Sequence, residues 1–266
     1  MSVRASACAL MVGCAVAFGV SAVEAKVVVP ETSVKPFSAV LDTMRSGLSG
    51  KLRGPFLTYL KYLPFSSKVD GRIGRYLIGF WPAERRRLTS VAYRNPNGFI
   101  EVTPENQDTR LSEHFRVRDF LTKGQLGIWP KYLVLREELV DKLELVIADL
   151  NGKGIEVRRM TVMSGFRTPQ YNGPGGEGRS GVSRHMYGDA ADVFVDNDGN
   201  GRMDDLNRDG RVDHRDARVI LAAVERVERR HPSLAGGVGV YRANSAHGPF
   251  AHVDVRGWRA RWGLIG

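Results

Sequence analysis

Two histidines and an aspartate, far apart along the chain, could bind one metal ion. His185 precedes Asp192 by seven positions, and His252 lies 60 positions beyond that aspartate. Two neutral imidazoles and a carboxylate are a ligand set that Zn²⁺ accepts, with a fourth tetrahedral position left for water. Gly188 permits a tight turn after His185, and Asp192 then lies on a short strand. We therefore expect a zinc site with the open position that hydrolysis requires. The alternative makes both histidines ordinary core residues.

An aspartate-rich segment, residues 196–216, follows Asp192 closely. Its seven aspartates within 21 residues of a basic chain would repel one another unless a cation neutralised them, although a solvated acidic turn is the alternative. Counted from Asp205, oxygen-bearing residues recur as in an EF-hand loop, with Gly210 at the sixth position and Asp216 in place of the usual Glu. The expected ligands of this structural Ca²⁺ are Asp205, Asn207, Asp209, Arg211, Asp213 and Asp216. A possible second, overlapping calcium loop would use Asp196, Asp198, Asn200 and Asp204.

The motifs that contain these residues resemble a known family. They are Ser164-Gly165-Phe166-Arg167-Thr168, then Ser183-x-His185-x-x-Gly188-x-Ala190-x-Asp192, and finally His252-Val253-Asp254. In this order they resemble the zinc D-alanyl-D-alanine carboxypeptidases and murein endopeptidases, which share their core fold with the hedgehog signalling domain. The aspartate-rich segment resembles a dockerin or EF-hand calcium loop inserted into that domain. The resemblance implies a zinc metallopeptidase that hydrolyses a D-amino-acid-containing peptide bond in the peptide stems of peptidoglycan.

The resemblance also suggests catalytic residues. Arg167 would bind a substrate carboxylate or stabilise an oxyanion. Many family members place a Glu or Asp three residues before the last zinc histidine as general base, or a second histidine two residues before it. Pro249 and Phe250 occupy those positions here. Two candidates for the base remain, Asp254 and His247. Asp254 could instead orient a zinc ligand, in the manner of an outer carboxylate.

Two questions of function stay open at this level. The sequence does not distinguish a carboxypeptidase, which needs a clamp for a free carboxylate, from an endopeptidase, which needs an open groove. A non-catalytic module that binds the cell wall and contains zinc and calcium is also compatible with the motifs, because related folds can retain a metal without catalysis.

The chain should fold as an α+β protein whose antiparallel sheet is flanked by helices. Apolar residues recur at helical spacing over 135–150 and 217–230, and strands are expected at 155–163, 190–194, 238–241 and 250–255. These elements belong to a peptidase domain at 108–266. Residues 26–107 should form a small β-rich region with a strand at 75–81 and a hairpin at 93–104, turning at Asn95-Pro96-Asn97-Gly98. This region would bind the wall, shape a rim of the cleft, or simply pack against the domain.

The first 25 residues read as a signal peptide, with a basic start, an apolar run and small residues before the expected cleavage site. A membrane anchor, or lipidation at Cys14, is the alternative. Both cysteines, Cys8 and Cys14, lie in this leader, so a cleaved chain would have no disulfides. We expect a periplasmic or wall-associated protein without an integral membrane segment. Its net charge of +10 favours polyanions such as the cell wall, and no nucleic-acid motif is present.

Overall fold

The computed structural model describes residues 60–85, 90–173 and 180–264. The chain divides into two units, residues 1–33 and 34–266, and every described residue belongs to the second. The expected signal peptide and both cysteines therefore lie outside the described residues, as do the first 34 residues of the predicted N-terminal region.

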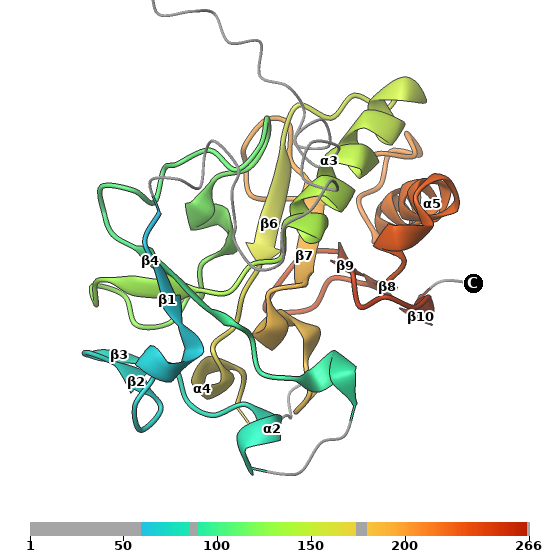
Figure 1. The fold of residues 1–266 in the computed structure, drawn as a ribbon. Helices are drawn as coiled ribbons and strands as arrows, with labels where there is room; N and C mark the ends of the chain where they lie inside the picture. Colours follow the sequence, from blue (N-terminus) through green and yellow to red (C-terminus); the bar gives the residue numbers. More distant parts are fainter. Residues whose placement is uncertain (1–59, 86–89, 174–179, 265–266) are drawn as a thin grey trace, which may run out of the picture. The chain divides into compact units, whose positions relative to one another are not determined.

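A five-stranded sheet forms the centre of this unit, in the order β10-β8-β9-β7-β6 (Figure 1). Its strands are β6 (Met160–Ser164), β7 (Ala190–Val195), β8 (Gly237–Tyr241), β9 (Phe250–Asp254) and β10 (Ala260–Gly263). Neighbouring strands are antiparallel except β8 and β10, which run parallel. The α+β class is confirmed, while the parallel pair departs from the expectation of an antiparallel sheet.

Two long helices pack beside each other, and α5 lies against β8 and β9 (Figure 1). These helices are α3 (Glu137–Gly152) and α5 (His214–Arg230). Asp213 caps α5 by accepting a hydrogen bond from the backbone N–H of Arg215, which satisfies a donor that the first turn leaves unpaired. The apolar faces of both helices join Val193, Val253 and other sheet residues in one buried cluster. Because side chains alternate along a strand, Asp192 and His252 project from the other face of the sheet.

The N-terminal elements form a second, three-stranded sheet in the order β1-β4-β5. It consists of β1 (Tyr62–Pro64), β4 (Gly98–Val102) and β5 (Lys131–Leu133); β2 (Arg72–Ile73) and β3 (Tyr76–Leu77) form a separate pair. The hairpin predicted at 93–104 is wrong, because η2 (Val91–Tyr93) precedes the turn and β4 pairs with β1 and β5 instead. The strand predicted at 75–81 is present only as β3.

Short helices connect these elements. They are η1 (Phe65–Ser67), α2 (Pro82–Arg85), η3 (Val117–Phe120), α4 (Pro169–Asn172), η4 (Arg184–Tyr187) and η5 (Pro232–Leu234). The most consequential is η4, which contains His185 and ends at Gly188 in the left-handed conformation, with φ of 68°. A Cβ atom at Gly188 would lie 2.3 Å from the carbonyl oxygen of Val134, so only glycine fits this turn.

Residues on either side of position 107 pack as one body. Strand β5 lies beyond that position but pairs with β4, which lies before it. The fully buried indole of Trp81 donates a hydrogen bond of 2.8 Å to the carbonyl oxygen of Met186, next to His185. The described part of the N-terminal region therefore supports the segment that carries a predicted metal ligand.

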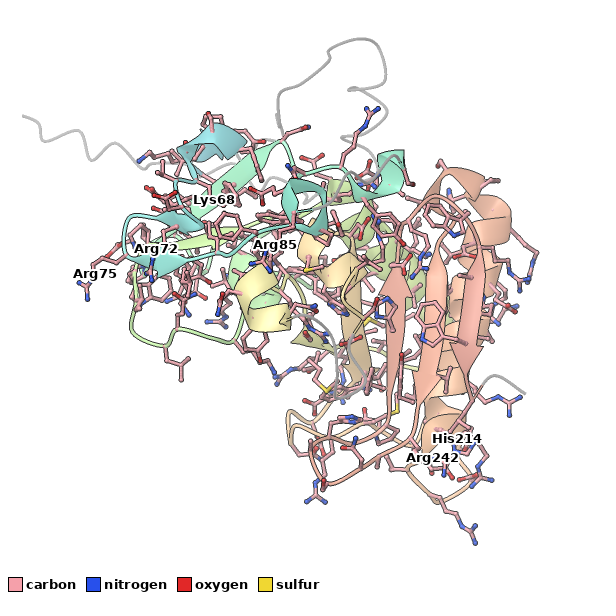
Figure 2. All side chains as sticks on the ribbon, turned by 90° about the horizontal axis from the view of Figure 1, so that it is seen from below. Lys68, Arg72, Arg75, Arg85, His214 and Arg242 are labelled. Carbon is pink, nitrogen blue, oxygen red and sulfur yellow. The ribbon has the colours of Figure 1, made fainter. Side chains whose placement is uncertain are left out.

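Positive charge gathers on the N-terminal elements. Figure 2 shows Lys68, Arg72, Arg75 and Arg85 around β2, β3 and α2. The Lys68 ammonium forms an ion pair of 2.6 Å with Glu84, whereas Arg72 and Arg75 are exposed.

Among the described residues, no helix is both long and apolar enough to cross a membrane.

Candidate metal centre

The three predicted ligands meet on the polar face of the five-stranded sheet. Asp192 on β7 lies directly opposite His252 on β9 in the strand register. His185 reaches the same point from η4, which precedes β7 by the short turn at Gly188. All three side chains are buried. The register between two strands and one tight turn therefore bring together residues that are up to 67 positions apart.

The ligand atoms form a compact triangle. His185 Nε2 lies 3.2 Å from His252 Nδ1 and 3.2 Å from Asp192 Oδ1, and the remaining edge measures 3.0 Å. In a tetrahedral zinc site, bonds of about 2.0–2.1 Å separate the ligand atoms by about 3.3–3.4 Å. The triangle is within a few tenths of an ångström of that spacing. The residues present therefore fit a small tetrahedral cation, which they would hold through two nitrogens and one oxygen.

A backbone carbonyl orients the first histidine. His185 Nδ1 lies 2.7 Å from the carbonyl oxygen of Gly165, an atom that can only accept a hydrogen bond. Nδ1 must therefore carry the proton, and the lone pair of Nε2 points towards the triangle. Sequence reasoning did not identify Gly165 as part of the site, because a backbone acceptor leaves no signature in residue type.

A carboxylate orients the second histidine so that its Nδ1, rather than its Nε2, faces the other two ligands. His252 Nε2 lies 3.1 Å from Asp254 Oδ2, so Nε2–H donates to that oxygen and Nδ1 faces the triangle. Asp254 is fully buried and also accepts hydrogen bonds from the backbone N–H of Gly237, at 2.7 Å, and from the guanidinium of Arg256. The hydrogen bonds to this carboxylate thus come from a backbone N–H, an imidazole and a guanidinium.

These contacts bear on the predicted general base. A base must take up a proton, yet His252 and Arg256 outweigh burial and hold the pKa of the Asp254 carboxyl far below its usual range. The carboxylate also lies behind the imidazole, at the nitrogen that does not face the ligand triangle. Its contacts favour the orienting role over the role of general base.

The other candidate base, His247, lies in the turn before β9. Its ring is 4.8 Å from the ring of Phe250, and its nitrogens contact Asn244 and the carbonyl oxygen of Gly248, at 2.9 and 2.8 Å. None of these contacts is with a member of the triangle. The structure thus places His247 on the neighbouring loop without bringing it into the group.

Arg167 joins the site as predicted from its motif. Its Nη2 donates to Asp192 Oδ2 at 2.5 Å, and its Nε donates to Ser164 Oγ at 2.8 Å. The guanidinium therefore holds one oxygen of Asp192 and turns the other, Oδ1, towards the two histidines. The Arg167 side chain is 15% exposed, so it is more accessible than the Asp192 side chain that it contacts, which is 6% exposed.

The ligands are electrostatically coupled. Burial lowers the pKa of His185, and it would also lower that of His252, but hydrogen bonds to Asp192 and Asp254 raise the pKa of His252 to about 9. Burial would raise the pKa of Asp192, but both histidines outweigh it and lower that pKa well below its usual value. A proton can thus occupy the space between His252 Nδ1 and Asp192, and a cation would displace it.

Two further contacts support His252. The Trp262 ring lies 5.1 Å from the imidazole, where Gly239 leaves room for it, since a Cβ at Gly239 would come within 2.2 Å of the indole nitrogen. The ammonium of Lys142, fully buried on α3, donates to the carbonyl oxygen of Asp254 at 2.8 Å and to Glu228 on α5 at 2.7 Å. Sequence patterns indicate neither contact, because lysines on a helix are usually solvated and the position of Trp262 beside His252 depends on the strand order.

The two expected calcium loops differ in the structure. Among the described residues, carboxylate oxygens of Asp196, Asp198 and Asp204 lie within 4.8 Å of one another, whereas the loop from Asp205 to Asp216 contains no comparable group of three. In that loop, the guanidinium of Arg215 donates two hydrogen bonds to the carboxylate of Asp213 and also forms an ion pair of 2.9 Å with Asp209. Asp216 accepts from the backbone N–H groups of Leu206, Asn207 and Asp213. Asp205 and Asn207 accept from backbone N–H groups of their own loop.

The structure thus brings three carboxylates together in the loop that begins at Asp196, while calcium binding by the loop that begins at Asp205 stays a prediction. In the loop that begins at Asp205, which the sequence favoured, Asp209 and Asp213 pair with Arg215. Backbone N–H groups donate to aspartates of both loops, including Asp198 and Asp204 in the first. Arg211 and Asn200 are both exposed, and Asn200 accepts from the backbone N–H of Arg202 at 2.8 Å.

Comparisons with known proteins do not identify the chain. No protein-family model matches it, and neither does any curated protein or solved structure. The structure itself defines a buried group of two histidines and an aspartate that can bind a metal ion.

Proposed function

We propose that this chain is a zinc-dependent hydrolase that cleaves a D-amino-acid-containing peptide bond in peptidoglycan. The observation that carries the proposal is the triangle of His185, Asp192 and His252, whose atoms are spaced for tetrahedral zinc beside a partly exposed arginine. The motif resemblance supplies the substrate class and a hedgehog-like peptidase fold. Export to the periplasm or cell wall belongs to the same proposal.

The chain's own residues prepare the site for this chemistry. Bound in the triangle, Zn²⁺ would acidify a water molecule and polarise a substrate carbonyl. Gly165 and Asp254 fix the two imidazoles so that each presents a lone pair. The Arg167 guanidinium has five N–H donors and donates two of them to Asp192 and Ser164. The remaining donors can bind a substrate carboxylate or a developing oxyanion.

One observation favours a second candidate, a non-catalytic module that binds the cell wall. Asp254 is fully buried and surrounded by donors, and the contacts of His247 do not reach the metal ligands. Neither of the bases proposed from the sequence is therefore positioned to take a proton from water. The high positive charge would suit binding to an anionic wall in either case.

Digestion of purified muropeptides distinguishes the candidates. The zinc-loaded protein should release a terminal D-alanine if it is a carboxypeptidase, or cut crosslinked dimers if it is an endopeptidase, with mass spectrometry identifying the product. His185→Ala should abolish cleavage and zinc binding, whereas His231→Ala, at an exposed position after α5, should retain both. Zinc binding and sedimentation with cell walls, without cleavage of either substrate, would establish the second candidate.

A further inference from the structure

A buried carboxylate oxygen at the end of β7 has no partner. Asp196 follows the last residue of β7 and is 0% exposed. Its Oδ2 accepts from Thr161 Oγ1 at 3.2 Å and from the backbone N–H of Gly201 at 3.3 Å, but its Oδ1 is buried without a hydrogen bond. A buried carboxylate oxygen is costly unless it is compensated, so an unpaired one indicates a bound group.

Two other carboxylates converge on the same place. Oxygens of Asp196, Asp198 and Asp204 lie within 4.8 Å of one another, as expected for ligands at about 2.3–2.6 Å from a common Ca²⁺. Asp198 is exposed and Asp204 is partly exposed, so an ion could reach the site from solvent. Oxygen-only ligands favour Ca²⁺ over Zn²⁺, which prefers nitrogen and sulfur.

The positive charge nearby is smaller than the negative charge. Arg159 approaches the loop, since a Cβ atom at Gly199 would lie 2.7 Å from its guanidinium. Arg202 also belongs to this loop but is exposed. Three carboxylates still outnumber these two guanidiniums, and a bound cation would offset the remaining negative charge. Asn197 fastens the loop to the segment before β6, because its side chain bonds to the backbone of Glu156 and Arg158 at 2.8 and 2.7 Å. The backbone N–H of Asn197 also donates to Asp204 at 2.9 Å, so this ligand is oriented before an ion arrives.

We propose that Asp196, Asp198 and Asp204 bind a Ca²⁺ ion that stabilises the end of β7. This strand also carries Asp192, four residues before Asp196, so the ion would support a metal ligand without taking part in chemistry. Waters can supply the remaining oxygen ligands that Ca²⁺ requires. The proposal does not depend on peptidase function, because it rests on contacts that are separate from the triangle.

Calcium titration of the zinc-saturated, metal-buffered protein tests this site. Isothermal calorimetry should give a single Ca²⁺ per chain, and a 100-fold excess over Kd should raise the melting temperature by about 5–10 °C. Hydrogen exchange of Ala190–Val195 should slow when Ca²⁺ is added. None of these readouts uses hydrolysis, so their failure would leave the peptidase proposal untouched.

A matched pair of variants locates the ion. Asp198→Asn removes a charged ligand at an exposed position and should weaken Ca²⁺ binding at least tenfold. Asp209→Asn makes the same change in the neighbouring loop and should leave the affinity unchanged. The reverse pattern would place the ion between Asp205 and Asp216 and overturn the proposal. Absence of Ca²⁺ binding to the wild-type protein would also overturn it, since Arg159 and water would then suffice.

Discussion

Replacing Asp254 by asparagine separates two roles for this carboxylate. If Asp254 orients His252, its loss should weaken zinc binding; if it is the general base, zinc should remain bound while hydrolysis is lost. The substitution preserves the shape of the side chain but turns one acceptor oxygen into a donor amide. Because Gly237, Arg256 and His252 all donate to Asp254, at least one of these donors must then face an N–H group.

The expected magnitude follows from that mismatch. If the amide faces His252, the imidazole loses a charge-assisted hydrogen bond; if it faces Gly237, a buried backbone N–H loses its acceptor. Either arrangement should lower the free energy of unfolding by about 1.5–3 kcal/mol. Loss of a group that orients a metal-binding histidine should also weaken zinc binding by about 10–100-fold.

Competition with a chromophoric chelator measures the zinc affinity, and chemical denaturation measures the stability. Asp108→Asn is the control, because Asp108 also pairs with an arginine but is 54% exposed, so its loss should change stability by no more than about 1 kcal/mol. A zinc affinity for Asp254→Asn within twofold of wild type, combined with complete loss of muropeptide cleavage, would refute the orienting role.

Two further substitutions test the supporting structure. Gly188→Ala should destabilise the protein by about 1–3 kcal/mol in urea denaturation, since the new Cβ would meet Val134 at a positive φ, whereas Gly154→Ala has an open environment and should cost less. Asp141 is a buried carboxyl whose pKa is raised to about 7 by burial and by neighbouring glutamates such as Glu137. The folded chain therefore holds this proton more tightly than the unfolded chain, and stability should fall as pH rises from about 4 to 7. The free energy of unfolding should fall by roughly 2–4 kcal/mol less over this pH range in Asp141→Asn than in the wild type. Melts at several pH values measure this difference, and the same pH dependence in both proteins would contradict a raised pKa for Asp141.

Much of the metal centre could be predicted because its residues lie on regular elements. Alternation along β7 and β9 places Asp192 and His252 on one face. The helical spacing predicted over 135–150 and 217–230 lies within two or three residues of the observed bounds of α3 and α5. The spacing of residue types then predicts a shared ion without knowledge of the strand order. The metal identity and the reaction stay predictions.

Other features depended on contacts that sequence patterns do not encode. The turn at residues 95–98 has strong turn chemistry, but β4 pairs with β1 and β5, and strand partners are chosen by tertiary packing. The loop beginning at Asp205 has the better ligand spacing, yet Arg215 pairs with Asp209 and Asp213 there, a contact that the spacing does not reveal. Residue type at a fixed spacing identifies potential ligands, whereas their hydrogen bonds decide which remain available.

The buried ammonium of Lys142 constrains how this sequence can diverge. It connects α3, α5 and β9 through Glu228 and the backbone of Asp254, with no solvent contact of its own. Loss of Glu228 alone would leave the Lys142 ammonium buried without a carboxylate, at a typical cost of about 3–5 kcal/mol. Loss of Lys142 should cost less, because Glu228 also pairs with Arg261. A joint exchange of both for apolar residues of similar volume need not be harmful. Among descendants of this chain, a change at position 228 should therefore be accompanied by a change at position 142, whereas position 142 can change alone while Arg261 is kept.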